Sequence, residues 1–407
     1  MSFLAVLGGP SVRTKPFPRW PKTGAEDGEL LLQVLQGAKW GRHQGQKTKA
    51  FEDQFANYQG ARFGIGVFNG SVAIRLALQA TGVAPGAEVI VPPYTFFSTA
   101  SSVVEVNAIP VFADIHPETY CLDPAAIEAV ITPRTRAIVP VHFAGQAAAM
   151  DDIMDIARRY GLIVIEDAAH AHGSEYHGKR LGSFGDMSTF SFQASKTLTC
   201  GEGGMILTSN EGYEKIGRSL HTCGRFPESA WYEHHLLGGN YRMNEFQAAL
   251  LIAQFSRLEE QVQRREANGL FLNQGLAAIP GIRPLARGFG ETRHGYALYV
   301  FRYDTDAFDG LPRQKFVEAL VAEGVPVSTG YDRPLYRQPV FVNRSFQSYA
   351  IAMEKAPDYK EVLCPVSERA CQEACWLPHS LLLGDERDMQ DIIRAVVKVY
   401  ENRWDLL

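Results

Sequence analysis

The chain has few cysteines, no long apolar run and no run of positive charge, and each shortage argues against a class of protein. Its six cysteines are scattered over 407 residues, which indicates reduced thiols rather than a disulfide framework. Its apolar runs are too short for a signal peptide or a membrane-spanning helix. The formal net charge of −5 argues against a nucleic-acid or anionic-membrane partner. We therefore expect a soluble, cytoplasmic protein.

Apolar residues, in contrast, are plentiful and regularly spaced. Hydrophobic residues make up 46% of the chain, enough for the core of one large domain and a smaller one. Short runs rich in valine and isoleucine alternate with helical patterns, which predicts an α/β fold with a mostly parallel sheet between helices. The predicted strands are residues 65–68, 89–92, 109–114, 137–142 and 162–167.

A long helical pattern over residues 240–268 closes this part of the chain. After it, an alternating strand at 296–303 and helices at 312–323 and 385–402 are typical of an α+β unit. We therefore predict a large α/β domain over residues 1–268, with an N-terminal arm, and a small domain over residues 269–407.

The turn Asn69-Gly70-Ser71 joins a predicted strand to a predicted helix. Free N–H groups at a helix start and the helix dipole both favour an anion over Gly70 and Ser71. Asparagine and serine are also ordinary helix caps. The turn alone therefore predicts an anion site and a plain cap about equally.

Polar residues gather at the end of the predicted strand 162–167, where a parallel sheet places its ligands. They are Glu166, Asp167, His170 and His172. Helix capping with buried histidines is one interpretation, and a metal site is another, but no further ligands stand at a metal spacing. An aspartate that keeps a pyridinium nitrogen protonated explains the acidic group better.

Lys196 lies in a glycine-containing loop between two β-forming runs, residues 188–192 and 204–208. Most lysines are solvated surface charges. A lysine desolvated beside apolar strands instead loses proton affinity and becomes an amine nucleophile, as a Schiff-base lysine must be. This loop is therefore the first candidate for a catalytic centre.

Three segments carry a resemblance to a known family. In chain order they are EDAAHAHG (166–173), FSFQASKTLTCGEGG (190–204) and GGNYRMNEFQAA (238–249). Together they resemble the DegT/DnrJ/StrS family of pyridoxal-phosphate enzymes, mostly aminotransferases of keto-sugars and keto-cyclitols. The resemblance covers nearly the whole chain. It implies the fold type I, aspartate aminotransferase-like architecture and pyridoxal 5′-phosphate as cofactor, with no metal.

By this resemblance, four residues surround the cofactor ring. Lys196 holds the cofactor as a Schiff base and then acts as the acid/base that moves protons. Asp167 pairs with the pyridine nitrogen, and His170 contacts the phenolic oxygen. Phe96 stacks on the face of the ring, although an aromatic residue at the end of a strand is more often part of the core.

The resemblance also assigns the residues around the cofactor phosphate. Gly70, Ser71 and Ser191 match the phosphate cradle, which favours the anion-site interpretation of the turn at Gly70. Asn240 matches an asparagine that reaches the cofactor phosphate of the neighbouring subunit. The resemblance therefore implies an obligate homodimer with shared active sites.

Gln193 distinguishes groups within the family. Many nucleotide-sugar aminotransferases carry histidine at the matching position, whereas cyclitol aminotransferases and 3-amino-5-hydroxybenzoate synthases carry glutamine. Residues 364–370 and 376–384 also resemble these last two groups. The candidates for substrate contacts are Gln193, Tyr331, Tyr336 and His379.

The first hypothesis is an aminotransferase that uses L-glutamine, or L-glutamate, as a small-molecule donor. Its acceptor would be a keto-cyclitol or keto-sugar such as scyllo-inosose or 2-deoxy-scyllo-inosose, in an antibiotic-type amino-cyclitol or amino-sugar pathway. The alternatives are a dehydratase resembling 3-amino-5-hydroxybenzoate synthase and a nucleotide-sugar aminotransferase, which Gln193 disfavours. A non-catalytic, cofactor-binding regulator is the alternative from another class.

Overall fold

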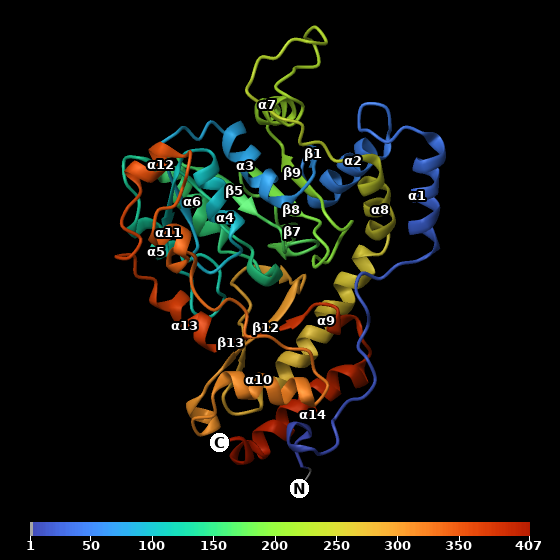
Figure 1. The fold of residues 1–407 in the computed structure, drawn as a ribbon, viewed down its shortest axis with the longest axis vertical. Coiled ribbons are helices and arrows are strands. Elements are labelled where there is room, and N and C mark those ends of the chain that lie inside the picture. Colours follow the sequence, from blue (N-terminus) through green and yellow to red (C-terminus); the bar gives the residue numbers. More distant parts are fainter. Residues whose placement is uncertain (1–2) are drawn as a thin grey trace.

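A seven-stranded sheet forms the centre of the molecule, in the order β1-β9-β8-β5-β4-β2-β3 (Figure 1). In this computed structural model, which describes residues 3–407, β9 is antiparallel to β1 and β8, and the other neighbouring strands are parallel. The prediction of a mostly parallel α/β sheet is confirmed. The strands are β1 Phe63–Val67, β2 Glu88–Val91, β3 Ile109–Phe112, β4 Thr135–Ile138, β5 Ile163–Asp167, β8 Met187–Ser191 and β9 Gly204–Thr208.

Successive residues of these strands face two different layers of helices. Val89 and Val91 pack in one hydrophobic cluster, whereas Ile90 between them packs in another. Both faces of the strand are therefore buried, which explains its continuous apolar sequence. One layer contains α3 (Gly70–Ala80), α4 (Ser98–Glu105) and α7 (Glu211–His221), and the other contains α2 (Lys47–Gln59), α5 (Pro124–Ala129) and α6 (Met150–Tyr160).

A smaller antiparallel sheet forms the second unit, from β10 (Ile282–Pro284), β12 (Leu298–Tyr303) and β13 (Ala374–Pro378). Its core includes residues of α10 (Arg313–Ala322) and α14 (Glu386–Glu401). A third sheet joins β11 (Glu291–Arg293) to the hairpin of β6 (Glu175–Tyr176) and β7 (Lys179–Arg180). Further helices are α1 (Ala25–Gly37), α11 (Pro339–Val342), α12 (Ala350–Lys355) and α13 (Pro365–Glu373). From residue 3 to 407, no helix has both the length and the apolar character needed to cross a membrane.

The single helix predicted over residues 240–268 is in fact two helices, α8 (Glu245–Phe255) and α9 (Leu258–Ala277). Asn244 caps α8 by accepting the N–H of Gln247, so the first helix begins later than predicted. α8 packs against α1 and α2, whereas α9 packs mainly against the short helix η5 (Leu381–Leu383), α14 and β10 of the smaller unit. The two helices therefore pack on different units. The continuous amphipathic pattern in the sequence does not reveal the break between them.

The hydrophobic cores cross the boundary predicted at residue 268. Leu4 packs in the core of the smaller unit, and Tyr336, Phe341 and Tyr359 pack in a core of the large sheet. The division into residues 1–268 and 269–407 stays a proposal, and these four side chains pack across its boundary.

Residues 8–24, which we call the N-terminal strap, connect the two units without forming a helix or strand. The strap runs from the lower end of the molecule, near α14, to α1 in the upper part (Figure 1). Near its start, the N–H of Val12 donates to the carboxylate of Glu323 (2.9 Å). Near its end, the side-chain amide of Gln254 donates to the carbonyl of Lys22 (3.0 Å). The strap is therefore fixed at both ends.

Candidate active site

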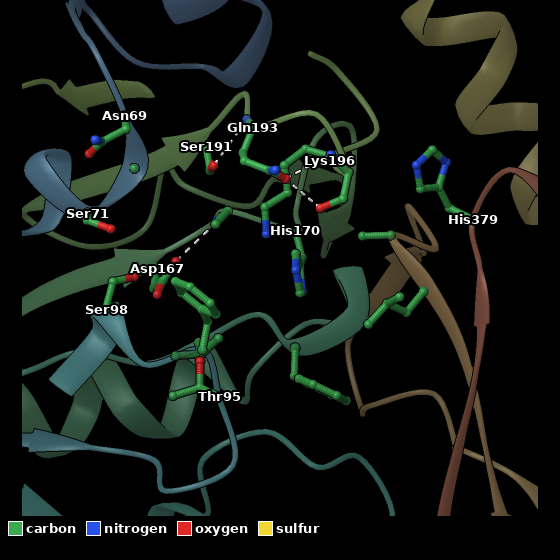
Figure 2. A pocket seen from close by; sticks show the side chains of 18 of the residues that line it. Asn69, Ser71, Thr95, Ser98, Asp167, His170, Ser191, Gln193, Lys196 and His379 are labelled. Carbon is green, nitrogen blue, oxygen red and sulfur yellow. Dashed lines mark hydrogen bonds between the residues drawn. The ribbon is translucent and has the colours of Figure 1, made fainter. Parts of the chain in front are cut away.

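A cavity of about 840 Å³ lies at the carboxyl-terminal edge of the large sheet. Residues from the ends of β5 and β8, the start of α3 and the end of β13 line it. Parallel strands bring their carboxyl ends to one edge, which explains why distant parts of the sequence meet here. In Figure 2, Asp167 lies on one side of Lys196 and His379 on the other.

The turn that carries Lys196 is held by its own backbone. The N–H of Lys196 donates a hydrogen bond to the carbonyl of Gln193 (2.8 Å), and the N–H of Cys200 donates one to the carbonyl of Phe192 (3.1 Å). Leu198 is buried in the core beneath the turn. The lysine side chain therefore reaches the cavity from a fixed backbone.

Burial lowers the pKa of Lys196 to about 8, while the nearby carboxylate of Asp167 acts in the opposite direction and raises it. An ordinary lysine titrates near 10.4. Near neutral pH, Lys196 therefore carries a much larger fraction of neutral amine than a surface lysine does, and the neutral amine is the nucleophilic form.

Asp167 ends β5 and is buried. Its carboxylate accepts the hydroxyl of Thr99 (2.8 Å) and the N–H of Ala169 (3.3 Å). Burial raises the pKa of Asp167 above its ordinary value, whereas these two hydrogen bonds and the charge of Lys196 lower it. A desolvated carboxylate of this kind is stabilised by a cation placed beside it.

His170 offers a neutral N–H donor to the cavity. The N–H of Ala144 donates to Nδ1 of His170 (3.2 Å), so the ring proton lies on Nε2. Burial lowers the pKa of His170 well below 6.5, with the charge of Lys196 acting in the same direction. The ring therefore donates a hydrogen bond without carrying charge.

The opposite end of the cavity has the features of an anion site. Gly70 and Ser71 begin α3, where backbone N–H groups have no acceptor within the helix. A Cβ on Gly70 would lie 2.9 Å from Cβ of Ser191, so only glycine lets the helix start approach β8 this closely. Ser191 Oγ accepts the N–H of Gln193 (3.3 Å), which leaves its hydroxyl hydrogen free to donate.

These residues fit pyridoxal phosphate, which presents a phosphate, a pyridine nitrogen, a phenolic oxygen and an aldehyde. The start of α3 with Ser191 matches the phosphate, and Asp167 matches a protonated ring nitrogen. The neutral N–H of His170 suits the phenolic oxygen, and Lys196 supplies the amine for the aldehyde.

The structure brings most of the sequence-predicted residues to this cavity. Phe96, 59% exposed, Gln193, Tyr331 and His379 line it together with the residues already described. Their roles toward cofactor and substrate stay proposals.

Two predicted residues lie elsewhere. Tyr336 is fully buried, donates its hydroxyl to Glu368 (2.8 Å) and accepts the N–H of Cys364 (3.1 Å), so its polar group is already satisfied in the core. Asn240 is exposed and does not line the cavity of its own chain.

Two groups around the cavity, Thr99 and Trp20, were missed from the sequence, and His172 was named only as one of the polar residues after the predicted strand 162–167. Thr99 fixes Asp167 through the bond described above, but a threonine in a helix gives no signal of such a contact. His172 lies beneath the lysine turn with Nδ1 3.3 Å from Oγ1 of Thr197. Trp20 lines the cavity from the N-terminal strap, 176 residues away from Lys196 in the sequence, where no local pattern points to it.

Comparisons with known proteins agree with this geometry. The sequence profile of the DegT/DnrJ/EryC1/StrS aminotransferase family matches residues 21–397. A protein of Streptoalloteichus tenebrarius, provisionally assigned as an L-glutamine:3-amino-2,3-dideoxy-scyllo-inosose aminotransferase, is 42% identical over 98% of both chains. An L-glutamine:2-deoxy-scyllo-inosose aminotransferase of the same organism is 39% identical over 99% of both chains.

A solved structure is similar over the same extent. The crystal structure of 3-amino-5-hydroxybenzoic acid synthase covers 96% of this chain and 100% of its own, with a TM-score of 0.87 and 34% identity. These matches confirm the resemblance found in the three sequence segments.

Proposed function

Because the chain belongs to the DegT/DnrJ/EryC1/StrS aminotransferase family, we propose that it moves an amino group from L-glutamine to a keto-cyclitol of the scyllo-inosose type. It is an aminotransferase that depends on pyridoxal 5′-phosphate. The observation that carries the proposal is the amine of Lys196, whose pKa burial lowers to about 8, beside Asp167 in a large cavity. The product is an amino-cyclitol of the kind used in antibiotic biosynthesis.

Different residues of this chain are assigned to different groups of the cofactor. Lys196 would bind it covalently, Asp167 would hold its ring nitrogen protonated, and His170 would donate to its phenolic oxygen. Gly70, Ser71 and Ser191 would bind the phosphate, and Phe96 would cover the ring face. The chemistry that the cofactor supplies is electron withdrawal and temporary storage of the amino group.

Lys196 also moves the protons that transamination requires. A base works best when its pKa lies near the working pH. With a pKa of about 8, Nζ of Lys196 accepts the proton from the amino carbon of the donor and delivers one to the carbonyl carbon of the acceptor. Burial thus tunes one amine for both roles.

The part of the cavity wall that includes Gln193 suits a ring that carries hydroxyl groups. Oε1 of Gln193 accepts the N–H (2.8 Å) and the hydroxyl (2.7 Å) of Ser195. This bonding leaves the side-chain N–H₂ of Gln193 to donate to substrate oxygens. We assign Tyr331 and His379 to the same substrate wall, and Tyr336 has no part in it because its hydroxyl is engaged in the core.

We further propose a homodimer in which Asn240 reaches the cofactor phosphate of the partner subunit. In support, the segment between α7 and α8 extends away from the rest of the chain (Figure 1) and exposes Trp231, Tyr232 and Leu237. Apolar side chains gathered on one exposed segment are typical of a surface that a partner covers. A cytoplasmic location completes the proposal, since all six cysteines are free thiols.

The visible absorption of the purified holoenzyme tests the proposed function. We expect the yellow band of the bound cofactor to disappear on addition of L-glutamine and to return when 2-deoxy-scyllo-inosose is added. A band that neither L-glutamine nor L-glutamate bleaches would contradict the proposal.

A dehydratase is the second candidate, because the synthase with the TM-score of 0.87 shares the architecture. A dehydratase would leave the absorption unchanged with an amino donor and would release water from a cyclic substrate. The same absorption experiment therefore separates the two candidates.

A further inference from the structure

Trp20 occupies a position that none of the proposed roles explains. It belongs to the N-terminal strap, yet it lines the same cavity as Lys196 and His379. Its indole N–H donates to the carbonyl of Ala194 (3.0 Å), two residues before Lys196. The strap therefore contacts the turn that carries the catalytic lysine.

The strap holds Trp20 firmly because both of its ends are clamped. Arg13 is buried, and its guanidinium pairs with Asp388 and Asp391 of α14, each at 2.8 Å. Just beyond the strap, Asp27 of α1 pairs with Arg257 (2.9 Å). Trp20 lies between these two anchors, so the ring has a defined place at the cavity wall.

Trp20 also packs against His379. The two rings lie 4.6 Å apart in an edge-to-face arrangement, with an interplanar angle of 81°. His379 is 4% exposed, and its Nδ1 finds no hydrogen-bond partner within residues 3–407. Burial lowers the pKa of His379 well below 6.5, so the ring that packs against the indole is neutral.

Together these two side chains form an uncharged aromatic part of the cavity wall. A ring of the scyllo-inosose type presents C–H bonds on its faces and hydroxyl groups around its rim. An aromatic side chain binds such a face through its apolar surface. An open-chain amino acid such as glutamine has no ring face to offer.

We propose that Trp20 is a substrate-positioning residue for the acceptor. Its ring, braced by His379, supports the face of the cyclic ketone, and its N–H holds the Lys196 turn at the reacting distance. This inference rests on the proposed function, because it takes a ring ketone as the acceptor. It assigns the N-terminal strap a role in choosing that ketone.

Two substitutions separate the contributions of the indole. Trp20→Leu removes the aromatic face, and we expect the KM for 2-deoxy-scyllo-inosose to rise about tenfold while the KM for L-glutamine changes by less than about twofold. Trp20→Phe keeps an aromatic ring but loses the N–H, so we expect kcat to fall about two- to tenfold with a smaller change in the ketone KM. Trp404→Leu and Trp404→Phe, at a tryptophan exposed near the C-terminus, are matched controls that should change neither constant.

A measurement independent of turnover keeps this inference distinct from the proposed function. The chain has five tryptophans, so the difference in fluorescence between wild-type and Trp20→Phe holoenzymes reports Trp20. We expect scyllo-inositol, a ring that cannot react, to change this difference signal. If wild-type holoenzyme turned over no ketone, the proposed function would fail. The fluorescence response would still show whether a ring binds beside Trp20. No fluorescence response, or equal changes in both KM values in Trp20→Leu, would overturn the inference.

Discussion

At Lys196, two opposing effects set the proton affinity of the amine. Burial lowers its pKa, and the carboxylate of Asp167 raises it, with burial the larger effect. The two side chains are thus coupled before any substrate binds. A lysine without this burial would be almost fully protonated at neutral pH.

The pH dependence of Lys196 modification tests this coupling. In cofactor-free protein, acetic anhydride should label Lys196 half-maximally at about pH 8, whereas surface lysines reach half-labelling near 10.4. In Asp167→Asn, the midpoint should move below 8, because the change removes the group that raises the pKa. Asp53→Asn, an exposed carboxylate paired with Lys49, is the matched control and should leave the midpoint in place. Mass spectrometry of the labelled peptide gives the answer, and a midpoint near 10.4 for Lys196 would contradict the assignment.

The sequence was sufficient to find the residues that carry the chemistry, but not the residues that hold them in place. Lys196 and Asp167 follow from a loop and a strand end, since their positions depend on short-range patterns. Thr99 and Trp20 act through contacts between distant elements, and nothing in their own neighbourhoods distinguishes them from packing residues.

At the scale of elements, Glu166 fastens β5 to the chain that leads into β8. Its carboxylate accepts the N–H groups of Gly182, Phe184 and Gly185, each at 2.7 Å. Nδ1 of His142 accepts an N–H, so the proton on Nε2 faces the same carboxylate at 2.9 Å. The strand that ends in Asp167 is thereby fixed from its other face.

Removing this carboxylate should destabilise the fold. Glu166→Ala leaves three backbone N–H groups without a partner, which should lower the free energy of unfolding by on the order of 3 kcal/mol or more. Glu211→Ala, which breaks an exposed ion pair with Arg62, is the control and should have little effect. Urea unfolding measures both, and equal midpoints for the two variants would contradict this account of Glu166.

Element order was also predictable, whereas element ends were not. The alternating apolar runs gave the parallel strands because each strand buries both faces. The break between α8 and α9 arises from packing on two different units, and the antiparallel direction of β9 depends on a tertiary path that the local pattern does not encode.

At the scale of the whole molecule, the proposed dimer makes each active site depend on two chains. Asn240 alone should matter little to its own cavity, because it is exposed and lies outside it. In the partner's site, loss of one hydrogen bond to the phosphate should weaken cofactor binding by about tenfold. Asn240→Ala therefore tests the dimer as well as the residue.

Mixed dimers give a sharper form of this test. Asn240→Ala and Lys196→Ala subunits, co-expressed with different tags, should form mixed dimers in which one of the two sites is intact. At a cofactor concentration too low to fill the weakened sites of Asn240→Ala homodimers, random pairing should restore about one quarter of wild-type activity. A mixture of Lys196→Ala with Asp167→Asn, two changes in the same chain's site, is the control. Here the mixed dimers have one altered residue in each site, so no recovery is expected. An absence of recovery in the first mixture would contradict a shared site.

The transfer of nitrogen from donor to acceptor is the reaction that the proposed function requires. Holoenzyme is incubated with L-glutamine labelled with ¹⁵N at the α-amino group and with 2-deoxy-scyllo-inosose, and the product is analysed by mass spectrometry. We expect an amino-cyclitol that carries ¹⁵N. Its formation should fall by more than about a thousandfold in Lys196→Ala and stay unchanged in Lys49→Ala, an exposed lysine paired with Asp53. A product without ¹⁵N, or full transfer by Lys196→Ala, would show that the enzyme does not transfer the α-amino group of glutamine through Lys196.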